Sequence, residues 1–300
     1  MREAIDKLFG QAGCDGQLCV QALDGSDEIA VHADRQAVAA SVFKVAVALE
    51  AETQFADGRL SPHERIILPA ASRTPGPTGF SLFCDDAETS LRDLVTAMLT
   101  ISDNTAADVL LHRVGIDTVN ASSARLGLAD TAITADLRTI INSIGCDAGF
   151  TDWTALLAWG SQPHSDKEHD QVAARILTAT ALTPALTTHT TPRDMATLLE
   201  LIWSDQAGPP PACQRIRQLM SQQLTKHRLA AAFPAPAHVA AKSGSLVGVM
   251  RNEIGVITCP DGRRYAAAVF TRARQPWKGE AAINAVIGTA AAAAIEALSH

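Results

Sequence analysis

Aromatic residues and an excess of positive charge are what this sequence most plainly lacks. Phe, Trp and Tyr make up 4% of its 300 residues, with a single tyrosine, so a core must be built mainly from Ala, Leu, Val and Ile. Acidic residues outnumber basic ones, 32 to 25, for a net charge of −7. Proteins that bind nucleic acid generally need a basic surface to neutralise phosphates. General nucleic-acid binding is therefore not expected.

Metal- and cofactor-binding patterns are also missing. The six cysteines form no CxxC pair and no cluster with histidine, and the histidines show no paired metal-ligand spacing. The stretch TPGPTG is rich in glycine and proline, but it lacks the lysine and the following helix of a phosphate-binding loop. We expect neither a metal nor a cofactor.

Targeting signals are the third absence. The first residues, MREAIDKLFGQAG, predict a short amphipathic helix without the apolar core and cleavage site of a signal peptide. If Met1 is the native start, the expected location is the cytoplasm; a mature chain cut from a precursor would look the same. The Ala-rich stretch 281–298 is interrupted by Asn284, Gly288 and Glu296, so we expect no membrane span.

The two ends of the chain carry β-prone runs, and the middle is mainly helical. Residues 18–23 and 28–33 predict a hairpin, and three further strands are expected near 238–245, 250–259 and 263–271, before a helix over 280–299. This order predicts an α/β (α+β) fold, in which an antiparallel sheet is built from both ends of the chain. We expect one domain, 1–300, with a sheet lobe (1–60 and 224–300) and an inserted all-helical lobe (61–223).

A serine and a lysine lie three residues apart at the start of an apolar helix. In Ser41-Val-Phe-Lys44 the two side chains share one helix face, so the amine can approach the serine oxygen. Burial favours the neutral amine, which could then accept the serine proton. An N-capping serine beside an exposed lysine is the alternative for such a short motif.

Two further short motifs follow along the chain. Ser102-Asp103-Asn104 lies between two helical segments, where it is either a simple turn or a second hydroxyl with a substrate-binding amide. Lys242-Ser243-Gly244-Ser245 lies in a strand-like run, where Gly244 permits close approach of a ligand backbone. An ordinary edge strand with an exposed lysine is the alternative there.

In this order the three motifs are similar to the S-x-x-K, S-D-N and K-T-G signature of class A β-lactamases and penicillin-binding proteins, here with KSG in place of KTG. The sequence resembles a class A β-lactamase-like serine hydrolase over most of its length. The resemblance implies the β-lactamase/transpeptidase-like fold, with Ser41 as nucleophile and Lys44 as its activating base. It makes Ser102 and Lys242 the proton-relay pair and Asn104 a substrate-amide contact.

The resemblance also assigns the rest of the substrate site. The backbone N–H groups of Ser41 and Ser245 would form the oxyanion hole, and Ser243 and Gly244 would line the site beside them. Arg251 falls where many class A enzymes keep an arginine for a substrate carboxylate, with a bare surface arginine as the alternative.

One part of the family pattern is not found. Class A β-lactamases use an Ω-loop glutamate to activate the deacylating water, and no acidic residue lies between Asp170 and Asp194 at the matching distance. Glu168 is a possible deacylation base, but it belongs to a polar stretch that reads equally as a solvated loop. The segment between Arg138 and Thr188 is also longer than the family leads us to expect.

The sequence therefore predicts a serine hydrolase that forms an acyl-enzyme on Ser41 with a small molecule that contains an amide, lactam or ester bond and carries a carboxylate. An acyltransferase or ester/amide hydrolase of natural-product metabolism, with little β-lactamase activity, is one alternative. A non-catalytic ligand-binding protein on the same fold is another. A β-lactamase would imply antibiotic resistance, whereas slow deacylation would leave the protein trapped by β-lactams.

Overall fold

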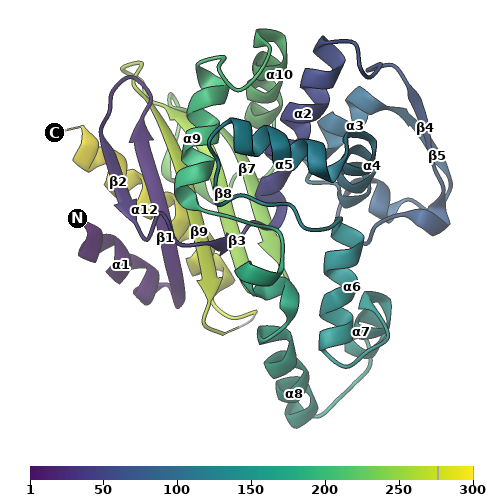
Figure 1. Ribbon diagram of the computed structural model, residues 1–300. Helices are drawn as coiled ribbons and strands as arrows, with labels where there is room; N and C mark the ends of the chain where they lie inside the picture. The colour runs from purple at the N-terminus through teal and green to yellow at the C-terminus, as the bar shows by residue number, and fades with distance from the viewer. Residues whose placement is uncertain (276, 300) are drawn as a thin grey trace.

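The computed structural model describes residues 1–275 and 277–299 (Figure 1). Its centre is a five-stranded antiparallel sheet in the order β2-β1-β9-β8-β7. The predicted N-terminal hairpin is present, although its first strand begins earlier than expected. The strands are β1 (Cys14–Ala22), β2 (Glu28–Val31), β7 (His238–Leu246), β8 (Met250–Thr258) and β9 (Arg264–Ala273). Both ends of the chain thus build one sheet, as the sequence predicted.

Helices cover both faces of the sheet. On one face lie α1 (Arg2–Gln11), α11 (Leu229–Ala232) and α12 (Glu280–Leu298), packed through an Ala- and Ile-rich layer. On the other face lie α9 (Pro192–Trp203) and α10 (Pro210–Ser221). By length and composition α12 could cross a membrane, but half of its most apolar window is buried inside the protein. Its apolar surface is that of a core helix.

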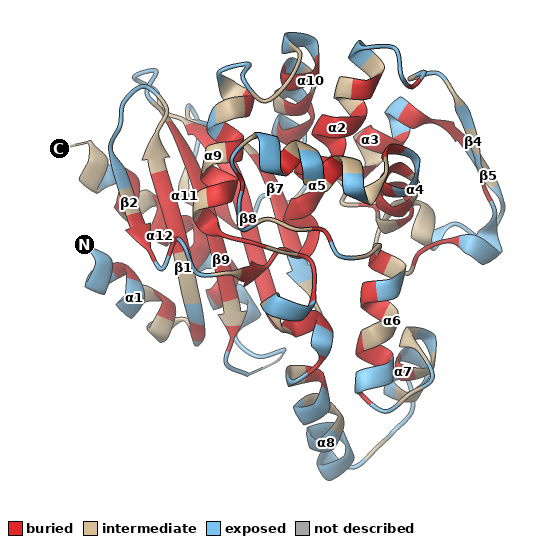
Figure 2. Cartoon of the chain, viewed as in Figure 1, coloured by how far each residue is buried: buried red, intermediate tan, exposed pale blue. Residues whose placement is uncertain are grey.

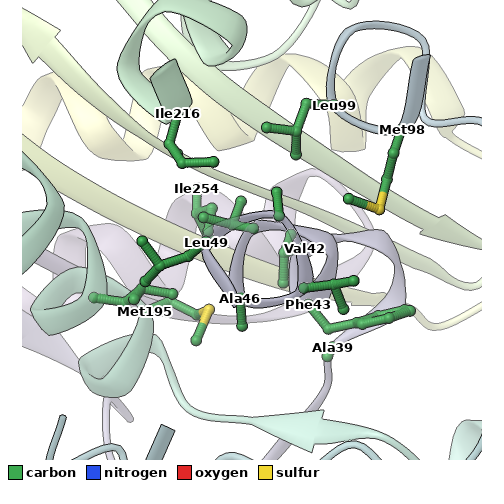
Figure 3. Close-up of a cluster of buried hydrophobic side chains, with 14 of the residues drawn as sticks. Ala39, Val42, Phe43, Ala46, Leu49, Met98, Leu99, Met195, Ile216 and Ile254 are labelled. Carbon is green, nitrogen blue, oxygen red and sulfur yellow. The ribbon is translucent and has the colours of Figure 1, made fainter. Parts of the chain in front are cut away.

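Helix α2 (Lys44–Ala56) occupies the middle of the molecule and follows directly from η1, the 3₁₀ turn Ala40–Phe43. Every residue from 37 to 51 is buried, so the predicted central helix is confirmed (Figure 2). Figure 3 shows Val42 and Leu49 among side chains from other helices and from the sheet, Ile254 of β8 among them. Around α2 lie α3 (Leu91–Thr100), α4 (Asn104–Val114) and α5 (Ile116–Arg125). This packing fixes the position of the helix that begins at Lys44.

The middle of the chain is less purely helical than predicted. A two-stranded ribbon of β4 (Arg65–Leu68) and β5 (Ala87–Ser90) projects beyond α3 and α4, and β3 (Ala37–Val38) pairs with β6 (His189–Thr190). Short 3₁₀ turns also occur, η2 (Ala70–Ser72) and η3 (Gly79–Leu82). Runs of two to four residues give too weak a periodic signal to separate them from loops.

The long segment that the sequence left ambiguous forms three helices. These are α6 (Leu137–Asp147), α7 (Trp153–Gly160) and α8 (Asp166–Leu177), followed by the turns η4 (Thr180–Leu182) and η5 (Pro184–Leu186). Asp136, Asp152 and Ser165 cap their N-termini, each accepting a backbone N–H from three residues on. In Figure 1, α7 and α8 form the lower end of the molecule, well separated from α2.

Candidate active site

Ser41 lies in the turn that leads into α2, where the backbone is unusual. The preceding residue, Ala40, has a φ of +46°, a conformation that residues with a Cβ rarely adopt. Strand β7 runs against this turn: a Cβ on Gly244 would lie 3.0 Å from the Ser41 backbone N. The absence of a side chain at Gly244 therefore allows the backbone of the Ser41 turn to approach, whereas the sequence predicted only the approach of a ligand. Strained residues held by close packing of this kind cluster at functional sites.

The amine of Lys44 is buried and held by the Ser102–Asn104 segment. Lys44 Nζ donates to the Ser102 carbonyl at 2.7 Å and to Asn104 Oδ1 at 2.8 Å, and it lies 3.3 Å from Ser102 Oγ. Burial lowers the pKa of Lys44 to about 7, while Asp103 and Asp108 act in the opposite direction. About half of the amines are thus neutral at neutral pH, as a proton acceptor requires.

Ser102 joins the two lysines. Lys242 Nζ donates to Ser102 Oγ at 2.9 Å, so both amines meet at one hydroxyl. Burial, together with the nearby Lys44, lowers the pKa of Lys242 well below its usual value. Ser102 has a φ of +60°, and the Asp103 carboxylate, which accepts from the Ala106 backbone N–H, stabilises this turn. The structure therefore brings Lys44, Ser102 and Lys242 together as predicted.

Ser41 opens into a small cavity of about 40 Å³, which two of the five predicted substrate residues share. Asn104 and Ser245 line it with Ser41, while Thr187 and Thr188 stand on the wall formed by the segment before α9. The Asn104 amide also donates to the Pro75 carbonyl at 2.8 Å, which ties it to the neighbouring loop. The remaining lining residues are apolar, and those of α6 are Leu137, Ile140 and Ile141.

The structure does not present Arg251 as a free guanidinium for a substrate carboxylate. Arg251 is buried and forms an ion pair with Glu280 at the start of α12, 2.8 Å away. The arginine that contacts Ser245 is Arg228, whose Nη2 donates to Ser245 Oγ at 2.6 Å. Its guanidinium also binds the carbonyls of Gly244 and Asn252. Sequence reasoning missed Arg228 because its partners are distant in the chain and no motif surrounds it.

A second group that the sequence did not indicate supports strand β7 from behind. Ser243, the other predicted residue of this strand, donates its backbone N–H to Gln223 Oε1, and its hydroxyl lies 3.3 Å from Thr225 Oγ1. Gln223 Nε2 donates in turn to Glu253 at 3.0 Å. Burial raises the pKa of Glu253. Ser243 is therefore a support of the strand in this structure.

Glu168 does not lie near Ser41. It is exposed at the first turn of α8, where it forms a capping box by accepting the Ser165 backbone N–H at 2.8 Å. These hydrogen bonds with Ser165 lower the pKa of Glu168. Figure 1 separates α8 from the start of α2. The geometry therefore does not support the prediction of Glu168 as a possible deacylation base, because Glu168 belongs to α8, which lies apart from the Ser41 cavity.

Comparison with known proteins finds relatives that match almost the whole length of this chain. A curated relative, the β-lactamase regulatory protein BlaB of Streptomyces cacaoi, is 27% identical over 309 residues, which cover 97% of this chain and 95% of BlaB. The solved β-lactamase of Sphaerobacter thermophilus superposes with a TM-score of 0.76 at 23% identity, covering 99% of this chain and 98% of that one. A mutant of PBP-A, solved as an acyl-enzyme complex with penicillin G, superposes with a TM-score of 0.74 at 21% identity and covers 98% and 96%.

These likenesses, with the antiparallel sheet and its flanking helices, define the class A β-lactamase fold. A family model described as the beta-lactamase enzyme family matches residues 1–298. The chain therefore belongs to the beta-lactamase enzyme family.

Proposed function

We propose that the protein forms an acyl-enzyme on Ser41 with a β-lactam or a related amide or ester, and that it releases the acyl group slowly. The observation that carries the proposal is a contrast within one site. The two lysines meet at Ser102, yet none of the described residues that line the Ser41 cavity carries a carboxylate. Lys44 and Lys242 are available as proton acceptors for acylation, whereas no carboxylate of the described residues lines the cavity to act as the base for deacylation.

In the acylation step, Ser41 Oγ attacks the carbonyl carbon and its proton passes to the neutral amine of Lys44. The C–O bond forms while the carbonyl π electrons move onto oxygen, where the N–H groups of Ser41 and Ser245 would stabilise the charge. Collapse of this intermediate breaks the C–N or C–O bond of the leaving group. Ser102, between Lys44 and Lys242, gives its hydroxyl proton to the leaving group and takes up in its place the proton that Lys44 accepted from Ser41.

The charge around Ser245 favours a substrate with a carboxylate. Lys242 and Arg228 both lie on or beside strand β7, and Arg228 contacts the Ser245 hydroxyl directly. A carboxylate near this hydroxyl would meet charge-assisted hydrogen-bond donors. The acyl-enzyme complex of the PBP-A mutant with penicillin G, a related fold, supports the choice of β-lactams as first probes.

Deacylation needs a water activated by a general base. The polar residues that line the cavity are Ser41, Asn104, Thr187, Thr188 and Ser245, and the α6 wall is apolar. Threonine hydroxyls are not bases near neutral pH, so Lys44 would have to serve both half-reactions. Transfer of the acyl group to an added amine is the competing outcome.

A fluorescent penicillin and a chromogenic cephalosporin test the proposal. We expect a covalent adduct on Ser41 that persists on a gel, with little turnover of the cephalosporin. Ser41→Ala should abolish the adduct, whereas Ser26→Ala, in the exposed β1–β2 turn, should leave it unchanged. Rapid turnover would contradict slow release. Absence of an adduct with both β-lactams and fluorophosphonates would contradict the nucleophile.

A second candidate is a regulatory role without chemistry. It is favoured by the name of the Streptomyces cacaoi relative, a β-lactamase regulatory protein. In that case a β-lactam would bind reversibly, and Ser41→Ala would bind it as tightly as the wild-type protein. Calorimetry of the two proteins with the same penicillin distinguishes the candidates, because covalent reaction requires the hydroxyl.

A further inference from the structure

A second, much larger cleft lies away from the Ser41 cavity. Its volume is about 930 Å³, against about 40 Å³ at Ser41, and it lies between α7, α8, the β7–β8 turn and the segment before α12. Pockets that hold small molecules have volumes of roughly 300–1,000 Å³. The cleft therefore has the size of a ligand site, and none of the residues that line it belongs to the acylation machinery.

The lining of this cleft is aromatic in a protein that has few aromatic residues. Three of the four tryptophans of the chain, Trp153, Trp159 and Trp277, line it. Around them stand aliphatic side chains of the two helices and the turn: Leu156, Leu157, Val172, Ile176, Leu177 and Val247. Aromatic rings pack well against other rings and flat apolar groups. The lining thus favours a ligand with an aromatic or otherwise apolar body.

Two of the lining residues are held in unusual backbone conformations. Val247 has a φ of +41° and Trp277 a φ of +57°, which is costly for residues with large side chains and most of all for a β-branched one. The Trp277 indole lies directly against Gly248, where an added Cβ would be 2.5 Å from Cδ1. The turn that follows Lys242–Leu246 thereby positions the tryptophan at the cleft.

Part of the apolar lining is exposed to solvent, although the ring of Trp159 is already stacked against His164. Leu157 and Trp277 are each 54% exposed, and α8 is mostly exposed (Figure 2). Charged residues stand at the same cleft: Lys278, Arg274 and Asp170. Arg274 is paired with Asp15 at 2.9 Å, whereas Lys278 forms no ion pair within residues 1–275 and 277–299. With Arg274 paired, the lining carries one positive and one negative charge, on Lys278 and Asp170, and Lys278 is the cation of the cleft that has no ion pair among the described residues.

We propose that this cleft is a second ligand site, which binds one small amphiphilic anion with an aromatic body and does so without reaction at Ser41. The apolar body would lie among the three tryptophans, and the anionic group beside Lys278. The bound molecule would touch Val247, the residue directly after the strand that carries Lys242 and Ser245. The site is independent of the acylation proposed above, and it is tested separately.

The test uses the full-length Ser41→Ala protein and two fluorescent probes, anionic 1-anilinonaphthalene-8-sulfonate and its uncharged analogue N-phenyl-1-naphthylamine. We expect saturable binding of one sulfonate molecule, accompanied by quenching of tryptophan emission. Leu157→Ala and Trp277→Ala should each weaken binding by roughly three- to tenfold. Leu224→Ala, which shortens a leucine outside the cleft that is 73% exposed, is the matched control and should change nothing.

Two further variants separate the parts of the proposal. Lys278→Met should weaken the sulfonate probe and leave the uncharged probe unaffected. Ala173→Trp should narrow the cleft and weaken binding of both probes. Thermal unfolding monitored by circular dichroism confirms that each variant is folded before binding is measured.

Several results would overturn the proposal. One is non-saturable binding, and another is an equal loss of affinity in Leu157→Ala and Leu224→Ala. A third is a concentration-dependent dimer, seen by sedimentation and lost in Trp277→Ala, because the cleft would then be a surface between two copies. If a penicillin adduct on wild-type Ser41 blocks the sulfonate, the cleft is part of the acylation site instead.

Discussion

Replacing Lys44 by methionine should stabilise the protein at acidic pH and abolish acylation. The folded-state pKa of Lys44, about 7, lies below its ordinary value of 10.5. The unfolded chain therefore binds more protons between these two values, and the stability of the wild-type protein rises with pH across that window. Below about pH 7 the full cost of burying the charge is present, and it fades as pH approaches 10.5.

The size of the effect follows from the same two pKa values. Linkage gives a burial cost of about 5 kcal/mol at pH 6 and about 2 kcal/mol at pH 9. Lys44→Met removes this cost and leaves the Ser102 carbonyl and Asn104 Oδ1 without their donor, a penalty of about 1–3 kcal/mol that does not depend on pH. The stability advantage of the variant should thus shrink by about 3 kcal/mol between pH 6 and pH 9.

Urea denaturation at both pH values, followed by far-UV circular dichroism, measures this difference. Lys7→Met, at an exposed position of α1, is the matched control, and its stability relative to wild type should not change with pH. The reasoning fails if the advantage of Lys44→Met is the same at pH 6 and pH 9, or if it grows with pH. The first result would mean that Lys44 keeps an ordinary pKa in the folded protein, and the second that its pKa is raised there.

Three further predictions concern the site. The rate of acylation by a fluorescent penicillin should rise with pH, with a midpoint near 7, because the neutral Lys44 amine accepts the proton; a flat profile would remove Lys44 as the base. Gly244→Ala should slow acylation by at least about tenfold, since its Cβ would press on the Ser41 turn. Gly10→Ala, where an added Cβ meets open space, is its control. Glu168→Ala should lower the melting temperature slightly through loss of the capping box and leave turnover unchanged; a large loss of turnover would restore Glu168 as the base.

The sheet and the centre of the site could be predicted because their signals are local or fixed in order. Alternating and apolar runs at both ends gave five strands, and the three motifs gave Lys44, Ser102 and Lys242, whose side chains the structure joins at the Ser102 hydroxyl. The buried run around α2 indicated a central helix, which Figure 3 shows surrounded by the core. These features depend on periodicity or on short spacing, both of which a sequence displays directly.

The parts of the site that the sequence did not predict depend on contacts between residues that are distant in the chain. The sequence does not show which of Arg228 and Arg251 is paired with an acidic residue; in the structure Arg251 pairs with Glu280 and Arg228 contacts Ser245. Glu168 lies in a polar stretch whose capping box forms a helix, and that helix leads away from Ser41. The tryptophans at 153, 159 and 277 show no common pattern until α7 and the β7–β8 turn are placed side by side.

The pairing of β1 with β9 has a consequence for how the protein is made. Strand β1 is among the first segments to be synthesised, but its neighbour in the sheet, which begins at Arg264, is among the last. At roughly 5–20 residues per second, β1 waits on the order of ten to fifty seconds for its partner. Closure of the sheet, and with it the contact between Gly244 and the Ser41 turn, must therefore follow synthesis of the helical middle. Expression at lower temperature or with chaperones should raise the soluble yield by protecting this unpaired strand.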